Sequence, residues 1–469
     1  MHCALCIEKE NLLMRVFTDI EGLMYYANVH LMLDELDIVL VRNQILDLLQ
    51  IKDYIISEID YDSVESLTEP STLLAPILEY AVGANIVSAD ETLFLASKIM
   101  GMLILRPSDL IDVYNGYIKK PQRFSEWFFD YNVKSNYFDS ISQHNRHWEA
   151  KGTTGKLEVA ILNSDISFDK SNKYPECDIC IENEGWSGSI NHTLRTVPVV
   201  LGDQDWFWYF EKSTTIAHKI VIANNHHTKA KFDINSLELL FDFNAVMPHY
   251  FVGFDTDAST HSHQHLVGGY KLMPLFKAKT LKTYRSALYP LVEIGLVDWY
   301  NTVIRLVGVD KKYILECARY ILSYYQTQFG ETGFAACLRK DKEGKLILEL
   351  TLTTGNGHLD NVLKSDIISV IDNLGVVHLD SNVASDIKEI EQFLTKEVKF
   401  VSEKLPSHLE KYKPMIEKLL KEVGSSKITP LESELNVRDE INAQCETMLK
   451  SIAVYTPEQV DEFFKGLMA

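Results

Sequence analysis

Three absences narrow the function of this chain of 469 residues. Lysine and arginine number only 46 against 66 aspartates and glutamates, a net charge of −20. That balance argues against nucleic acid or an anionic membrane surface as the main partner, because both need a basic footprint. No apolar run approaches the roughly 20 residues of a membrane-spanning helix. No glycine-rich loop of the P-loop or dinucleotide type occurs, so a phosphate site must use side chains.

We expect neither a leader segment nor a disulfide framework. Glu8, Lys9 and Glu10 precede any apolar stretch, so we expect no signal peptide. Seven cysteines, an odd number without a secretory signal, indicate reduced thiols. Hydrophobic residues make up 46% of the chain, an ordinary globular composition. The sequence therefore predicts a cytoplasmic protein with a sizeable core.

The periodicity of apolar residues changes along the chain. Residues 1 to about 140 have helical spacing, for example in a helix through Leu36, Val39, Leu40, Leu46 and Leu49. Further helices are expected at 72–82, 90–105, 385–396 and 405–423, and strands at 157–161, 206–210, 218–223, 249–254, 303–307 and 346–353. Strands and helices do not alternate as βαβ units. This favours an α+β fold with an antiparallel sheet.

Three alternating histidines, His261, His263 and His265, form the most informative motif, and Gly268-Gly269 follows them. Residues two apart on a strand point to one face, so we expect the three imidazoles side by side. Such a cluster is typical of metal binding or of a nucleophilic imidazole that attacks phosphorus. A solvated strand end or an accidental run explains the three histidines equally well by themselves.

A second motif is the C-x-x-C pair of Cys177 and Cys180. Its two thiolates can reach one tetrahedral zinc ion, but they supply only half of a site. His226, His227 or one histidine of the triplet can complete it; two unrelated buried cysteines are the alternative. Cys3 and Cys6 lack a nearby histidine cluster, and we do not expect them to bind metal.

Polar residues near these motifs are candidate substrate contacts. Asn183 and Glu184 can pair with sugar or ribose hydroxyls, although a helix cap or turn explains the segment better by itself. A basic stretch follows the histidines, and near a phosphate site it is notable in so acidic a chain. A solvated face still accounts for most of its members, which are Lys271, Lys277, Lys279, Lys282 and Arg285.

Together these segments resemble a known family. Residues 174–192 (YPECDICIENEGWSGSINH) are similar to the YPxCxxCxENEGYxGxxNH stretch of the class II (Firmicutes-type) galactose-1-phosphate uridylyltransferases. Residues 248–253 (PHYFVG) resemble the family's PHYFxG segment, and 263–269 (HQHLVGG) its H-x-H-F-Q-G-G motif. Weaker likeness runs from about Val41 to about Phe393, so the resemblance covers most of the chain.

The resemblance implies a fold and a reaction. The fold is α+β with an antiparallel core related to the histidine-triad (HIT) proteins: a helical region at 1–140, a HIT-like catalytic half at 141–285, and a C-terminal half at 286–469 ending in helices. The reaction converts UDP-glucose and galactose 1-phosphate into UDP-galactose and glucose 1-phosphate, in galactose metabolism. An imidazole carries the uridylyl group between the two sugar phosphates. No organic cofactor is implied, and the family indicates a homodimer.

Two alternative alignments of the histidine run with the family motif give different nucleophiles. Counting back from Gly268-Gly269 without a gap puts it on His265, with His263 as its orienting partner. A shift of two residues matches His261, His263 and His265 to the H-x-H-x-H of HIT hydrolases and makes His263 the nucleophile. We favour His265, because both flanking segments carry the family pattern.

The chain also departs from the family. Val267 stands where the family's glutamine donates a hydrogen bond to phosphate, and His261 is a candidate replacement donor. The family's HNTITPxxR stretch is replaced at 332–339, where only Arg339 matches; it is the candidate for holding the sugar phosphate. The stretch at 354–360 departs as well. Two alternatives therefore stay open: a HIT-like nucleotide hydrolase or transferase for another sugar phosphate, and a non-catalytic paralogue.

Class I relatives bind a structural zinc through C-x-x-C, a later histidine and the first histidine of their motif. By analogy, Cys177, Cys180, His227 and His263 are the expected ligands here.

Overall fold

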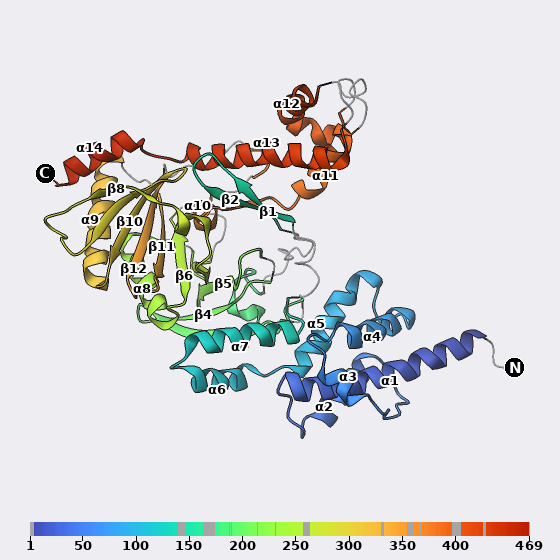
Figure 1. Cartoon of the computed structure of the whole chain (residues 1–469). Helices are drawn as coiled ribbons and strands as arrows, with labels where there is room; N and C mark the ends of the chain where they lie inside the picture. The colour runs from blue at the N-terminus through green and yellow to red at the C-terminus, as the bar shows by residue number, and fades with distance from the viewer. Residues whose placement is uncertain are drawn as a thin grey trace. The chain divides into compact units, whose positions relative to one another are not determined.

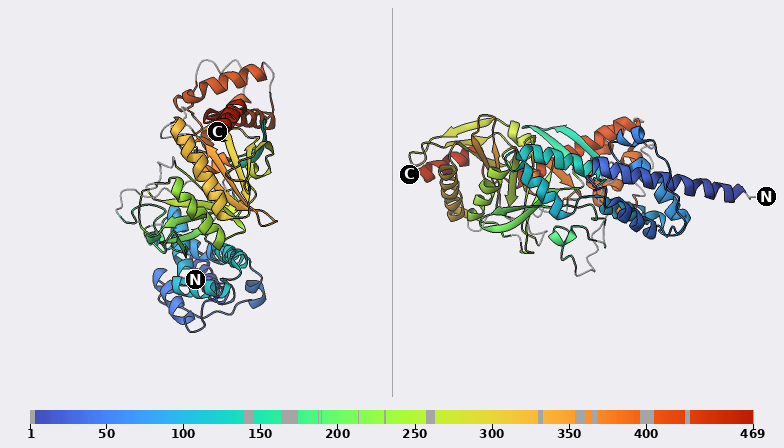
Figure 2. Two further views of the ribbon diagram at one scale, coloured as in Figure 1. Left: turned by 90° about the vertical axis from the view of Figure 1, so that its left-hand side faces the viewer. Right: turned by 90° about the horizontal axis from the view of Figure 1, so that it is seen from below.

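The structure, a computed structural model, describes residues 4–138, 146–162, 174–186, 188, 190–212, 214–229, 231–256, 263–329, 333–353, 361–364, 368–395, 405–424 and 428–468. They belong to two compact units. The first comprises 1–140, 167–200 and 205–212, and the second 141–166, 201–204 and 213–469. Figure 2 gives two further views in which the elements of each unit can be followed by colour.

The N-terminal part of the first unit is helical, as expected (Figure 1). Its helix α7 packs aromatic side chains on strand β4 (Gln204–Phe210): Phe124 and Phe128 both meet the ring of Trp208 edge-on. The helices are α1 (Ala4–His30), α2 (Ile38–Leu48), α3 (Tyr61–Glu65), α4 (Ser71–Gly83), η1 (Ala89–Glu91), α5 (Thr92–Leu103), α6 (Pro107–Tyr117) and α7 (Pro121–Lys134).

One expected core face in this region is wrong. The helix predicted through Leu36 exists as α2, and it buries Val41, Ile45 and Leu46. Leu36, Val39 and Leu40, however, are 90%, 59% and 52% exposed. Leu36 precedes α2, and the helix turns residues 39 and 40 away from the buried side. Apolar spacing located the helix but not the side that it buries.

Ten strands form the main sheet, in the order β3-β4-β5-β7-β6-β11-β12-β10-β9-β8. From β5 to β8 in this order every pairing is antiparallel, which confirms the α+β prediction. The strands are β3 (Val197–Leu201), β4 (Gln204–Phe210), β5 (Ile220–Asn224), β6 (Tyr250–Asp255), β7 (His265–Tyr270), β8 (Thr280–Tyr284), β9 (Glu293–Val297), β10 (Thr302–Gly308), β11 (Phe334–Lys340) and β12 (Leu346–Leu352).

The two faces of this sheet are covered differently. Helix α9 (Lys311–Phe329) lies over one face, where Ile314 contacts Gly308 of β10, and α8 (Leu237–Val246) packs beside it. On the other face Val370, the first residue of α10 (Val370–Asn373), lies over Gly253 of β6. A large core joins this second face to a small sheet of β1 (Arg146–Lys151), β2 (Lys156–Ile161) and β13 (Val376–Leu379).

The chain ends in helices, as predicted. They are α11 (Val383–Leu394), η7 (Ser407–Tyr412), α12 (Lys413–Val423), α13 (Pro430–Ser451) and α14 (Pro457–Met468). Every strand expected from the sequence overlaps an observed one, namely β2, β4, β5, β6, β10 and β12. The expected boundary at 285/286 falls between β8 and β9, which pair in one sheet; the three-region division stays a prediction. Among the described helices, none is both long and apolar enough to cross a membrane.

Candidate functional site

The histidine run meets the main sheet at a single residue. Strand β7 begins at His265, whereas His263 lies in a bend just before the strand. The expectation of three imidazoles on one strand face is therefore wrong for His263, because that residue is not part of the ladder. His261 lies outside the described residues. The run instead divides into a strand residue and a preceding loop residue, with different surroundings.

Hydrogen bonds to backbone carbonyls fix both imidazoles. Nδ1 of His265 lies 3.0 Å from the carbonyl oxygen of His263, and Nε2 of His263 lies 2.7 Å from the carbonyl oxygen of Asn224. A carbonyl only accepts, so each of these ring nitrogens carries a proton, and in a neutral ring the other nitrogen holds the lone pair. His265 then presents its lone pair at Nε2, and His263 presents its own at Nδ1.

Asn224, at the end of β5, organises the loop that carries His263. Its backbone amide donates to the carbonyl oxygen of Gln264 at 3.0 Å, and its side-chain amide donates to Gln204 at 2.9 Å. Its side-chain oxygen accepts from the backbone amide of His226 at 2.9 Å. Through its backbone and its side chain, Asn224 thus links Gln204, His226 and Gln264. The sequence interpretation missed it, since a lone asparagine after an apolar strand carries no distinctive signal.

A cross-strand row at the start of β7 shows what surrounds His265. Ala223 pairs with His265 on one side. On the other side, the pairing of β6 with β7 ends at Gly253 and Val267, two residues short of Asp255 and His265. Ala335 of β11 pairs with Asp255 and is followed by the buried Thr351. All these side chains lie on one face of the sheet, because pairing preserves the face.

This row combines polar and very small side chains. Ala223, the partner of His265, and Ala335, the partner of Asp255, are both buried. One oxygen of Asp255 accepts a hydrogen bond from the backbone amide of Val370 at 3.1 Å. Asp255 was also missed from the sequence; its position at the end of an apolar strand was the available signal.

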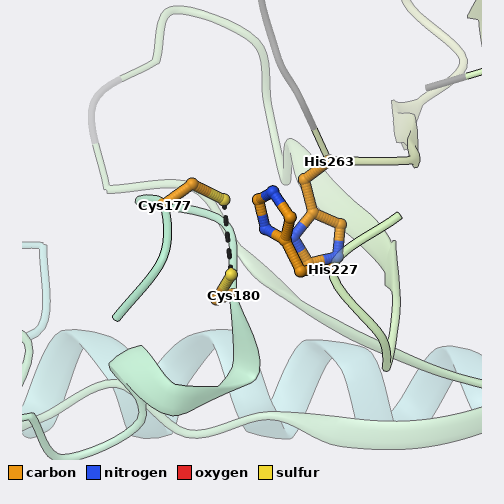
Figure 3. Close-up of side chains that lie close together, drawn as sticks. All are labelled: Cys177, Cys180, His227 and His263. Atoms are coloured by element: carbon orange, nitrogen blue, oxygen red, sulfur yellow. Dashed lines mark hydrogen bonds between the residues drawn. The ribbon is translucent and has the colours of Figure 1, made fainter. Parts of the chain in front are cut away.

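A Cys/His cluster adjoins this site (Figure 3). Cys177, Cys180, His227 and His263 offer ligand atoms that all lie within 4.8 Å of one another. The two sulfurs are 3.4 Å apart, near the separation of about 3.8 Å that two thiolates have on tetrahedral zinc with bonds of about 2.3 Å. The His227 and His263 rings meet at 72° with centroids 5.0 Å apart.

The donor set suits a metal such as zinc. Two thiols with two imidazoles are a standard zinc set, and a protonated Nε2 on a carbonyl is the usual outer contact of a ligating histidine. Without a cation, burial raises the pKa of both thiols, that of Cys180 to about 12. A bound cation reverses this preference, because the thiolate is the ligand. His226 does not join the described cluster.

Asn183 and Glu184 lie inside the protein next to the C-x-x-C turn. The Asn183 side chain is fully buried and donates to the carbonyl oxygens of Cys177 at 2.7 Å and Cys180 at 3.0 Å. The Glu184 carboxylate accepts from the backbone amide of Thr196 at 2.8 Å, and burial raises its pKa. Asn183 therefore braces the turn and Glu184 binds Thr196, and a substrate contact for either stays a prediction.

Arg339 lies away from His265. On β11 it is four residues beyond Ala335, a distance of about 13 Å along a strand. Its guanidinium pairs with the buried Glu349 at 3.1 Å and stacks 4.6 Å from the centre of the Phe276 ring. Nε of Arg305 forms an ion pair with the same Glu349 carboxylate at 2.9 Å. The structure does not bring Arg339 to the histidine site, so its sugar-phosphate role stays a prediction without geometric support.

Comparison with known proteins gives a consistent set of relatives. No protein-family model matches the chain. It is 25% identical to the galactose-1-phosphate uridylyltransferase of Caldanaerobacter subterraneus over 94% of this chain and 95% of that protein. The protein of the same name from Halalkalibacterium halodurans is 28% identical over 76% and 75%. That from Bifidobacterium longum is 30% identical over 65% of each chain.

A solved structure of yeast Ap4A phosphorylase Apa2 in complex with Ap4A gives a slighter likeness. It is 12% identical, covers 57% of this chain and 93% of that one, and has a TM-score of 0.35.

Proposed function

Because the chain belongs to the galactose-1-phosphate uridylyltransferase family, we propose that it moves a uridylyl group between UDP-glucose and galactose 1-phosphate through an intermediate on His265. The observation that carries the proposal is the hydrogen bond from Nδ1 of His265 to the His263 carbonyl oxygen. With the Nδ1 proton on that oxygen, the lone pair of the neutral ring is on Nε2, and a neutral imidazole is a competent nucleophile.

The reaction has two similar halves. Nε2 of His265 attacks the α-phosphorus of UDP-glucose, and the bond to the bridging oxygen breaks with its electrons, which releases glucose 1-phosphate. Galactose 1-phosphate then attacks the same phosphorus, and the imidazole leaves. Neither half needs a proton transfer, because both the leaving and the attacking groups are phosphate oxygens. One nucleophile in one fixed tautomer therefore serves both halves.

The same geometry supports the His265 register over the His263 register. His263 is 1% exposed, its Nε2 is bonded to Asn224, and it belongs to the Cys/His cluster. We propose that Cys177, Cys180, His227 and His263 hold zinc. Bound there, zinc supplies structural cross-linking of the segments before β7. The carbonyl oxygen of His263 orients the His265 ring, and Asn224 holds the segment that carries His263.

Cellular setting and assembly are part of the same proposal. We expect a cytoplasmic homodimer whose partners are UDP-sugars and hexose 1-phosphates, with no nucleic acid and no organic cofactor. Light scattering on the purified protein measures its molar mass. A monomeric mass at every concentration tested would refute the proposed homodimer.

Intact mass spectrometry tests the central step. After mixing with UDP-glucose, the chain should gain one uridylyl mass, and peptide mapping should place it on His265. Adding galactose 1-phosphate should discharge the adduct and yield UDP-galactose. An adduct on His263 would overturn the register, and a chain that never gains the mass would overturn the proposed reaction.

Val267 offers a gain-of-function prediction. It lies two residues after His265 on the same face of β7, partly buried, and has no donor for phosphate. A hydrogen bond to a charged group contributes about 1.5–3 kcal/mol. We expect Val267→Gln to speed adduct formation by roughly 10- to 100-fold, measured by rapid-quench mass spectrometry. Val267→Met, of similar length without a donor, is the control; an equal acceleration by methionine would refute the hydrogen-bond explanation.

A further inference from the structure

We propose that the second unit carries a binding site for a small sugar phosphate, separate from the histidine site. The site is a cavity of about 330 Å³, a size typical of small-molecule pockets. Three segments line it: the β1–β2 hairpin, the turn η5 (Pro274–Lys277) with the two residues after it, and the two residues after β9. The proposal goes beyond uridylyl transfer and does not depend on it.

The cavity is distant from His265 within the main sheet. Asp298 lines the cavity and directly follows β9, and β9 is five strand spacings from β7 in the order β7-β6-β11-β12-β10-β9. Adjacent strands lie about 4.8 Å apart, so β7 and β9 are separated by roughly 24 Å along the sheet. A ligand in this cavity therefore does not take the place of the phosphorus that His265 would attack.

Two lysines of the basic stretch that follows the histidines supply positive charge to this cavity. Other members of the stretch are engaged elsewhere: Nζ of Lys271 donates to two backbone carbonyl oxygens, and Lys282 pairs with Asp461 at 2.6 Å. Lys277 and Lys279 line the cavity and are exposed, and neither has an ion-pair partner among the described residues. Both ammonium groups can therefore bind an anion.

Most of the other charged groups of the lining are satisfied within the protein. Lys156 pairs with Glu149 at 2.5 Å, and the Glu158 carboxylate lies 3.1 Å from Nε2 of His147. Asp298 is exposed and has no ion-pair partner within the part of the chain that the structure describes. The unpaired charges of the cavity are thus two ammonium groups and one carboxylate, in a chain whose net charge is −20.

Hydrogen bonds join the three lining segments to the rest of the unit without any ligand. The Tyr300 hydroxyl donates to the carbonyl oxygen of Gly155 at 2.6 Å and holds the hairpin turn. The backbone amide of Asp298 donates to the carbonyl oxygen of Lys279 at 2.9 Å and joins the other two segments. Because the walls are already in place, a ligand has little chain to order when it binds.

Trp299 gives the cavity a fixed aromatic wall. Its Nε1 donates to the carbonyl oxygen of Asn373 at 3.0 Å. The hairpin packs tightly on the ring, because a Cβ at Gly155 would lie 3.0 Å from the ring atom Cζ3. An aromatic wall with a few polar groups around it is the usual lining of a pocket for a small organic ligand, rather than for a bare ion.

These groups fit a phosphate joined to a hydroxylated body. Lysine ammonium groups bind phosphate as point charges, and a phosphate monoester carries nearly two negative charges at neutral pH. The Asp298 carboxylate repels a bare anion, but it accepts hydrogen bonds from hydroxyl groups. A sugar phosphate satisfies both the lysines and the carboxylate, whereas inorganic phosphate satisfies only the lysines.

Isothermal titration calorimetry on the full chain tests the site, with glucose 6-phosphate, inorganic phosphate and glucose as probes. Glucose 6-phosphate is chosen because the proposed transfer reaction uses 1-phosphates. We expect it to bind more tightly than either other probe. The double variant Lys277→Gln/Lys279→Gln should weaken its binding by at least about tenfold. Asp298→Ala should weaken glucose 6-phosphate but tighten inorganic phosphate, since the repulsion is lost while the hydroxyl acceptor is lost too.

Lys282→Gln is the matched control, because it removes a lysine of the same basic stretch that does not line the cavity. It should bind glucose 6-phosphate like wild type, and so should His265→Gly. Thermal unfolding checks that each variant is folded. Unchanged binding in the double lysine variant, or no binding by wild type, would overturn the proposed site, and equal affinity for inorganic phosphate would overturn its sugar-phosphate assignment. The titrations contain no UDP-sugar, so these failures leave the uridylyl-transfer proposal standing.

Discussion

Replacing His265 with glycine should abolish uridylylation. Glycine removes the ring whose Nδ1 lies on the His263 carbonyl oxygen, and with it the Nε2 lone pair, while the backbone can still continue β7. Loss of a covalent nucleophile typically costs several powers of ten, so we expect the exchange rate to fall by at least about 10⁴-fold. Radiolabelled exchange between UDP-glucose and glucose 1-phosphate is sensitive enough to measure the residual rate.

Two other histidine variants complete this test. His261→Ala should retain most of the adduct, because the preferred register gives His261 no covalent role. His263→Gly should reduce activity and metal content together, since the ring belongs to the Cys/His cluster. A His265→Gly protein that still acquires the uridylyl mass would exclude His265 as nucleophile.

Replacing Cys180 with serine should remove the metal and lower the thermal stability. Serine is a poor zinc ligand, and losing one of four ligands weakens binding by about hundredfold or more. Stabilisation by a ligand at 100 times its Kd is about 2.7 kcal/mol, and its loss lowers Tm by roughly 5–10 °C in a domain of 150–250 residues. Elemental analysis of untagged protein and differential scanning calorimetry measure the two effects.

Cys317→Ser is the control for this substitution, since Cys317 is also buried but lies on α9 outside the cluster. Its metal content should equal that of wild type. A wild-type chain with well under one equivalent of metal would reject the proposed zinc, and the Cys180 variant should then unfold at a temperature close to that of wild type.

The sequence predicted features that depend on local patterns. The helical N-terminal region, the strand Leu346–Leu352 and the terminal helices all follow from apolar periodicity and turn residues. Spacing identified the C-x-x-C pair, and the family resemblance added His227 and His263 to one hypothesis, which the cluster supports. Strand β8 escaped prediction because four of its five residues are exposed and lysine interrupts its apolar pattern.

Features that depend on long-range pairing could not be predicted. The pairing of His265 with Ala223 follows from the register of β5 against β7, and neither residue carries information about the other. Arg339 was singled out by its place in a motif, yet Glu349 and Phe276 engage it elsewhere in the sheet. The outward position of Leu36 likewise reflects where α2 begins, which apolar spacing alone does not fix.

The carbonyl contact of His265 has a consequence for mutational drift. Its acceptor is a main-chain oxygen, which every amino acid possesses, so no point mutation at residue 263 deletes it. A substitution there can only redirect the oxygen by moving the backbone. A change of side chain at residue 263 therefore leaves the acceptor of the His265 Nδ1 proton in place. The same change would alter the proposed metal site, to which the His263 ring belongs. Residue 263 can therefore lose its proposed role as a metal ligand while the tautomer of His265 is preserved.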